Sequence, residues 1–250
     1  MFSFSSLSVF FDLMFEDNVY NQTGFLQSCN KGIIEVVDMF MMLEYIDPSA
    51  DNNYAIRVAS ENGHIAVVER LLQDETGTGR VDPSADDNYA IRLASRNGHA
   101  DVVDILLRDG TGRVDPSADD NYAICWAVRN GHADVVDRLL QEGRVDPSAD
   151  NNYAIYYASR NGYVDIVDRL LQEDRSKNRV DPSVLDNDAI RVASEFGHVD
   201  VVDRLLQDDR VDPSALDNFP IRIAYKNGHI AVVNRLLQDP RCFIKNFDIN

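Results

Sequence analysis

Residues 53–72 read Asn-Tyr-Ala-Ile-Arg-Val-Ala-Ser-Glu-Asn-Gly-His-Ile-Ala-Val-Val-Glu-Arg-Leu-Leu, and variants of this stretch recur along almost the whole chain. A fixed period of roughly 20–50 residues is typical of stacked-repeat proteins, in which no unit can bury its apolar face alone. The pattern therefore predicts an array of similar units with a long surface and no single deep pocket. One glycine marks each unit, and successive glycines are 31 to 35 residues apart: Gly32, Gly63, Gly98, Gly131, Gly162, Gly197 and Gly228.

Each unit is predicted to contain two helices separated by a tight turn. Asn53 stands where the first helix needs an N-cap, and Ile56 begins its apolar face. Gly63 ends that helix, because glycine adopts the left-handed C-terminal position at the lowest cost. Val67 and Leu71 then form an apolar stripe with i, i+4 spacing on the second helix. The unit is thus helix, turn, helix.

A short projecting hairpin is expected to connect each unit to the next. Residues 80–85 read Arg-Val-Asp-Pro-Ser-Ala, and Pro83 excludes a helix there. Differences in length between units fall just before this segment, as in residues 74–79, which places the insertions in loops on one face.

The N-terminal segment, residues 1–21, is predicted to be a capping helix or half-repeat. Leu7, Phe10 and Met14 follow helical spacing behind Ser5 and Ser6. A secretory signal peptide is disfavoured, because the segment lacks a basic n-region and Asp12 interrupts its apolar run. Residues 22–250 are then expected to form one repeat domain.

At these residues the chain resembles the ankyrin repeat family. Tyr-Ala-Ile-Arg occupies the place of the family's Thr-Pro-Leu-His, and Gly-His, Val-Val and Leu-Leu follow in register over about seven units, residues ~22–240. The sequence of the connecting segment is similar to that found in ankyrin arrays of amoebae and of the large DNA viruses that infect them. The resemblance implies an all-α ankyrin solenoid whose first helices and hairpins line a concave groove, and a protein that binds other proteins and is not an enzyme.

Composition excludes several classes of partner. The net charge of −18 disfavours nucleic acid, because an acidic surface repels a polyanion. No apolar run approaches the roughly 20 residues of a membrane span. The three cysteines are odd in number and lack the spacing of a metal site, which favours reduced thiols in a cytoplasmic protein.

No motif for catalysis, a cofactor or a metal ion is evident. Every histidine follows a turn glycine, so a structural role is expected, and stacking would hold these rings too far apart to share a metal ion. The five are His64, His99, His132, His198 and His229.

Charged residues are predicted to form a solvated outer face. On the second helices Asp165 and Arg169, and Asp200 and Arg204, have the i, i+4 spacing of intrahelical ion pairs. The arginines that precede each hairpin, such as Arg113 and Arg210, are expected to form a ladder with aspartates of neighbouring units.

The positions that vary between units indicate where a partner would bind. The middle units carry arginine, tryptophan and tyrosine on the first helices, the residue types most enriched at binding hot spots. Packing between units is an alternative role for Trp126 and Tyr157. Candidate partner-binding residues are Arg92, Arg96, Trp126, Arg129, Tyr156, Tyr157 and Arg160, with Asp87 and Asp120 at the hairpin tips.

Two functions remain open at this point. The first is a protein-binding module, monomeric, that holds a partner in the groove and at the hairpin tips. The second is a structural array that associates end to end, because the last unit, residues 230–237, is no more polar than the internal ones.

Overall fold

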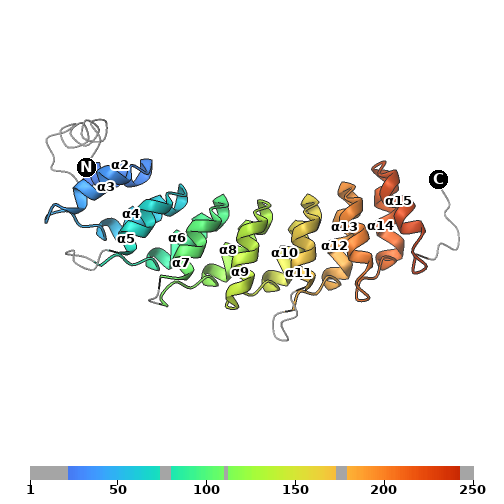
Figure 1. The fold of residues 1–250 in the computed structure, drawn as a ribbon. Helices are drawn as coiled ribbons and strands as arrows, with labels where there is room; N and C mark the ends of the chain where they lie inside the picture. The colour runs from blue at the N-terminus through green and yellow to red at the C-terminus, as the bar shows by residue number, and fades with distance from the viewer. Residues whose placement is uncertain (1–21, 74–79, 110–111, 173–178, 243–250) are drawn as a thin grey trace. The chain divides into compact units, whose positions relative to one another are not determined.

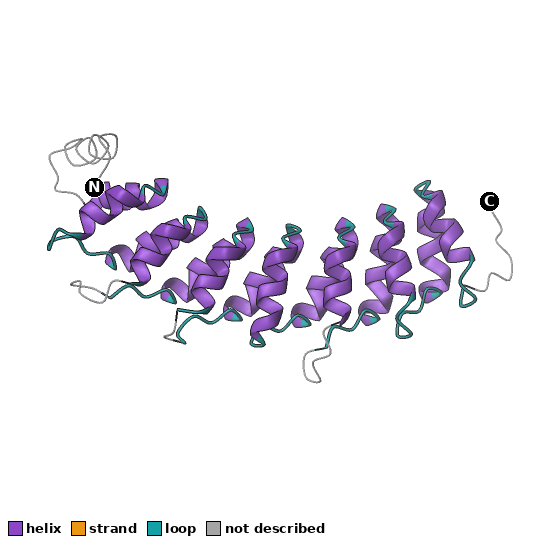
Figure 2. Cartoon of the chain, in the orientation of Figure 1, coloured by secondary structure: helices purple, strands orange, loops and turns teal. Residues whose placement is uncertain are grey.

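The computed structural model describes residues 22–73, 80–109, 112–172 and 179–242, and in these ranges the chain is helical without any β-strand (Figure 2). The all-α repeat fold predicted from the sequence is confirmed. The N-terminal half-repeat predicted for residues 1–21 lies outside the described residues. Within the described ranges fourteen helices follow one another as seven pairs: α2 Gln22–Lys31 and α3 Ile34–Met41; α4 Ala50–Glu61 and α5 Ile65–Leu72; α6 Ala85–Asn97 and α7 Ala100–Leu107; α8 Ala118–Arg129 and α9 Ala133–Glu142; α10 Ala149–Asn161 and α11 Val164–Gln172; α12 Val184–Phe196 and α13 Val199–Leu206; α14 Ala215–Lys226 and α15 Ile230–Leu237.

The chain divides into two compact units, and the boundary falls inside α8. The first unit runs to Ala123 and includes Gln141–Arg144; the second comprises Ile124–Leu140 and the chain from Val145 onwards. In the first unit α2, α4 and α6 pack in succession, as do α3, α5 and α7 (Figure 1). In the second unit α10, α12 and α14 form one layer, and α11, α13 and α15 form the other. None of the described helices is long and apolar enough to cross a membrane.

The core of each repeat consists of the small and branched side chains that recur at the same helical positions in successive repeats. Ile155 on a first helix and Leu139 on a second helix are at most 1% exposed. Alanines on the first helices, such as Ala158 and Ala193, are fully buried, which lets neighbouring helices approach closely. Burial of these apolar groups between repeats is the main source of stability.

The turn glycines are required both by backbone conformation and by the next repeat. Gly162 has a φ of +78°, and a Cβ there would lie 2.6 Å from Nδ1 of His198. The Nε2 of His198 donates a hydrogen bond to the carbonyl oxygen of Arg160 at 2.8 Å, which satisfies a carbonyl at the end of the preceding first helix. The structural role predicted for the histidines is confirmed at His64, His99, His198 and His229, which make the same contact.

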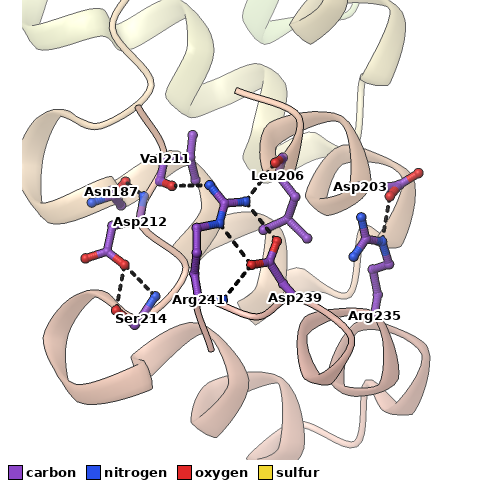
Figure 3. Close-up of polar contacts among 9 residues, drawn as sticks. All are labelled: Asn187, Asp203, Leu206, Val211, Asp212, Ser214, Arg235, Asp239 and Arg241. Atoms are coloured by element: carbon purple, nitrogen blue, oxygen red, sulfur yellow. Dashed lines mark hydrogen bonds and ion pairs between the residues drawn. The ribbon is translucent and has the colours of Figure 1, made fainter. Parts of the chain in front are cut away.

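The segments predicted as hairpins are turns built on Asp-Pro-Ser. Oδ1 of Asp115 accepts hydrogen bonds from the backbone N–H of Ser117 at 2.9 Å and from its hydroxyl at 2.6 Å. The hydroxyl contributes most to holding the pKa of Asp115 below its ordinary value, against a smaller opposing effect of burial. Figure 3 shows the equivalent contacts between Asp212 and Ser214.

After each of these turns the backbone makes one left-handed turn before the right-handed helix begins. Asparagine and aspartate tolerate this conformation better than most residues, which explains their recurrence there. The last residue is asparagine, whose backbone N–H donates to the serine carbonyl four residues earlier, as in Asn88 to Ser84 at 2.9 Å. The left-handed residues are 51–53, 86–88, 119–121, 150–152, 185–187 and 216–218.

The predicted N-cap role is wrong for Asn53, Asn88, Asn152 and Asn187, whose side-chain oxygens bind the next repeat. Oδ1 of Asn88 accepts a hydrogen bond from the backbone N–H of Asp115 in the next repeat, at 2.7 Å, and Asn187 contacts Asp212 in the same way. No side-chain cap hydrogen bond is formed at the serine that precedes α6. Four of the asparagines therefore connect their repeats to the following ones and are buried: Asn53, Asn88, Asn152 and Asn187.

Ion pairs on the second helices link neighbouring repeats, and the predicted intrahelical pairs of Arg169 and Arg204 are wrong. Nε of Arg204 lies 2.6 Å from Oδ1 of Asp168, one repeat earlier, and Arg169 pairs with Asp137. Figure 3 shows the last of these pairs, between Arg235 and Asp203. The carboxylates are a third to a half exposed, so each pair contributes only about 0.2–1 kcal/mol.

The arginines before each Asp-Pro-Ser turn mostly bind backbone oxygens of the preceding repeat. Arg113 does pair with Asp82, at 3.2 Å, as predicted. Arg144 and Arg210 instead donate to the carbonyl oxygens of Val114 and Val180, at 2.7 Å and 2.8 Å. The ladder is therefore held by backbone acceptors as much as by carboxylates.

Candidate functional site

The nine residues predicted to bind a partner fall in both units of the structure. Asp87, Arg92, Arg96 and Asp120 belong to the first unit. The remaining five, Trp126, Arg129, Tyr156, Tyr157 and Arg160, belong to the second. The two groups belong to different units, and the single groove expected from the sequence remains a prediction.

Arg92 in the first unit links its own repeat to the following one. NH2 lies 2.8 Å from a carboxylate oxygen of Asp119, and NH1 donates to the carbonyl oxygen of Asp87 at 3.1 Å. Its guanidinium carbon lies 5.7 Å from the ring centre of Tyr89 and 4.8 Å from that of Tyr122. The side chain of Arg92 is only 15% exposed and its guanidinium is already bound, so little of it is accessible to a partner.

The other three residues of the first unit lie at the surface. Asp87 and Asp120 are exposed in their left-handed turns, and Arg96 is exposed near the end of α6. Asp87 also lies 3.4 Å from NH1 of Arg92.

Arg129 in the second unit is surrounded by aromatic rings. Its guanidinium carbon lies 4.6 Å from the ring centre of Trp126 and 5.1 Å from that of Tyr157. NH1 also donates to the hydroxyl oxygen of Tyr153, at 3.3 Å. Such cation–π contacts stabilise a guanidinium without neutralising its charge. Arg129 remains exposed, so it presents a fixed positive charge to the solvent.

Three tyrosines of α10 complete what we call the aromatic–arginine cluster: Trp126, Arg129, Tyr153, Tyr156 and Tyr157. The ring centres of Tyr153 and Tyr157 are 4.2 Å apart, and those of Tyr156 and Tyr157 are 5.0 Å apart at an interplanar angle of 82°. Burial first, and then the hydrogen bond with Tyr157, raise the pKa of Tyr153 to about 12, while Arg129 acts in the opposite direction. The phenol therefore stays protonated at neutral pH.

Arg160 forms a second cation–π pair further along the same layer of helices. Its guanidinium carbon lies 5.0 Å from the ring centre of Phe196, a side chain that is 44% exposed. Sequence reasoning missed Phe196, although it stands where most other repeats carry asparagine before the turn glycine. It also missed Tyr153, because a tyrosine recurs at this position in several repeats and gave no sign of a special role.

The described residues offer no arrangement for metal binding or thiol chemistry. In these ranges no three His, Cys, Asp or Glu side chains come together as metal ligands. Burial is the main effect that raises the pKa of Cys29 and Cys125 to about 12 and that of Cys242 to about 11. These thiols are therefore protonated, and a protonated thiol is a poor nucleophile.

Comparison with known proteins agrees with the repeat architecture. A family model described as ankyrin repeats in three copies matches residues 91–181 and 156–248. The two matches together cover more than half of the chain. A search of the curated proteins found no match.

Proposed function

Because the chain belongs to the ankyrin repeat family, whose repeats are in general protein–protein interaction modules and typically not enzymes, we propose that it binds a partner protein. The contact surface that we propose is the first-helix layer of the second unit, centred on the aromatic–arginine cluster and extended by Arg160 and Phe196. Free thiols at Cys29, Cys125 and Cys242 support a reducing compartment such as the cytoplasm.

The observation that carries this proposal is the environment of Arg129 and Arg160. Both are held against aromatic rings, and neither has a carboxylate partner among the described residues. This is unusual in a chain of net charge −18, where Arg92, Arg169 and Arg204 are all paired with aspartate. Arginines held against aromatic rings, half-buried around Arg129 and exposed at Phe196, have the composition of binding hot spots.

The charges of this surface indicate the chemistry of the partner. Arg129 and Arg160 favour a segment with acidic residues at its centre. The exposed Asp150, at the start of α10, favours a basic residue at its flank. A segment with this charge order would complement both zones, whereas a uniformly charged segment would not.

Replacing Arg129 or Tyr156 with alanine is expected to weaken partner binding by about 2 kcal/mol, roughly thirtyfold in Kd, if these residues are hot spots. The partner would first be captured from a cell lysate with the full chain and identified by mass spectrometry. Calorimetry with the purified partner then measures the loss of affinity for each variant.

Asp165→Ala is the matched control, because Asp165 is exposed on the second helix α11 and forms no described hydrogen bond or ion pair. Its affinity should equal that of the unchanged protein. A loss for Asp165→Ala together with full affinity for Arg129→Ala and Tyr156→Ala would place the contact on the second helices instead.

The last described repeat supports a second candidate function, association between copies. Leu237 is 53% exposed, whereas Leu206 at the same position one repeat earlier is 6% exposed. Oδ1 of Asn218 is buried without a hydrogen-bond partner among the described residues, although Asn187 uses this oxygen to bind the following repeat. No described atom lies within 4 Å of a Cβ on Gly228, the position that a histidine ring covers at Gly162 and Gly197.

If this end binds another copy, light scattering on the full chain should show a mass that rises with protein concentration. Leu237→Glu should abolish the rise, because it places a charge in the apolar contact. Ile65→Glu, which changes a side chain that is 39% exposed, is the control and should leave the rise intact. A mass that stays monomeric at every concentration would exclude association.

A further inference from the structure

Four repeats place an arginine in the same site at the start of the first helix. In each, the guanidinium donates to a carbonyl oxygen of the left-handed turn in its own repeat: Arg57 to Asp51, Arg92 to Asp87, Arg191 to Leu185 and Arg222 to Leu216. The distances from the guanidinium nitrogen to the carbonyl oxygen are 2.9–3.1 Å. The side chain thus stabilises a backbone turn whose residues all have positive φ.

In the first unit the following repeat completes this site with a carboxylate and an aromatic ring. Arg57 lies 2.5 Å from Asp86, and its guanidinium carbon is 5.4 Å from the ring centre of Tyr89. Arg92 meets Asp119 and Tyr122 in the same way. Both side chains are only about one-sixth exposed, so the site encloses a guanidinium closely.

The repeat that contains α8 lacks this arginine, although the repeat after it retains the matching carboxylate and ring. Cys125 stands at the arginine position. Asp150 and Tyr153 occupy the positions of Asp86 and Tyr89. Because a cysteine is much shorter than an arginine, the carboxylate of Asp150 receives no donor from this position.

Two carboxylates, those of Asp150 and Asp146, act electrostatically on Cys125. The carboxylate of Asp150 is exposed and has no hydrogen bond or ion pair among the described residues. After burial, the charges of Asp150 and Asp146 are the causes that raise the pKa of Cys125. Arg129, four residues further along α8, is held at the hydroxyl of Tyr153 and does not pair with Asp150.

We propose that an arginine side chain of the partner protein occupies this site, bound to Asp150 and against Tyr153, beside Cys125. The proposal rests on the proposed function, since it identifies the basic flank of the segment that the aromatic–arginine cluster would bind. Arginine is favoured over lysine because its planar guanidinium stacks on a ring and binds a carboxylate with two parallel N–H groups.

The probe is a capped tripeptide, acetyl-Gly-Arg-Gly-amide, titrated into the full chain while backbone amide signals are followed by NMR. We expect saturable shifts at Cys125, Asp150 and Tyr153, and at least tenfold weaker binding of the matched lysine peptide. Asp150→Asn should abolish the shifts. Asparagine tolerates the left-handed conformation of residue 150, so this variant keeps the fold.

A second variant, Cys125→Arg, places an arginine in the site from within the chain. It should abolish peptide binding and raise the midpoint of urea unfolding, because the new side chain can pair with Asp150 as Arg57 pairs with Asp86. If Cys125→Arg does not fold, Asp150→Asn decides the matter alone.

Absence of shifts at these three residues, or shifts that persist in Asp150→Asn, would overturn the inference. Its failure is distinguishable from failure of the proposed function. A partner whose affinity depends on Arg129 and Tyr156 but not on Asp150 would leave the binding surface intact and remove only the arginine site.

Discussion

Replacing Gly162 with alanine is expected to destabilise the second unit by about 2–5 kcal/mol. Two effects contribute. A left-handed residue with a Cβ costs about 1–2 kcal/mol, and the φ of Gly162 is +78°. The added methyl group would also lie 2.6 Å from Nδ1 of His198, so the ring must move and its 2.8 Å hydrogen bond to the carbonyl oxygen of Arg160 is lost. Urea titration followed by circular dichroism measures the loss.

Gly228→Ala is the matched control, because Gly228 has the same φ of +78° but no described atom within 4 Å of the added methyl group. This variant should lose only the stability, about 1–2 kcal/mol, that a Cβ costs in the left-handed conformation. The double variant Gly162→Ala, His198→Ala should lose less stability than the sum of its two single changes, since the ring is no longer displaced. Equal losses for Gly162→Ala and Gly228→Ala would show that the ring contributes nothing.

Leu139→Ala is expected to cost about 2–5 kcal/mol, as a cavity in a core that cannot close around it. Leu236→Ala, in the last described helix, should cost clearly less. Both leucines are fully buried, so the two substitutions remove the same apolar group from equally buried positions. In a linear array, a repeat with neighbours on both sides is expected to contribute two interfaces, whereas the repeat of Leu236 has a described neighbour on one side.

Urea titrations of the two leucine variants measure this difference directly. Leu237 would be a poor comparison, since it is already 53% exposed and its removal leaves no cavity. Identical losses for Leu139→Ala and Leu236→Ala would contradict a stability that is the sum of repeats and their interfaces.

The charges and asparagines show where prediction from the sequence stopped. Arg204 has Asp200 four residues before it, a spacing that predicts an intrahelical pair, and yet it binds Asp168 in the preceding repeat. Asn187 precedes a right-handed helix and resembles an N-cap, and yet its oxygen binds the backbone of Asp212. In both residues a partner about 30 positions away competes with a local one, and the spacing along one helix contains no information about it.

The candidate binding residues also show what residue type predicts and what only contacts between repeats decide. Arg92 and Arg129 are both arginines on first helices, and residue type alone made them equal candidates. The structure separates them, since Arg92 is enclosed by Asp119 and two tyrosine rings whereas Arg129 is exposed between Trp126 and Tyr157. Tyr153 entered the site only through its contacts with Arg129 and Tyr157.

By itself the sequence determined the period, the two helices of each repeat and the glycine that separates them. These features depend on the apolar spacing of a helix and on the low cost of positive φ at glycine, which act over a few residues and repeat with them. The tertiary structure alone decided which side chains join one repeat to the next and which arginines remain available to a partner. Those outcomes depend on distances between residues far apart in the chain, which arise only when the repeats are stacked.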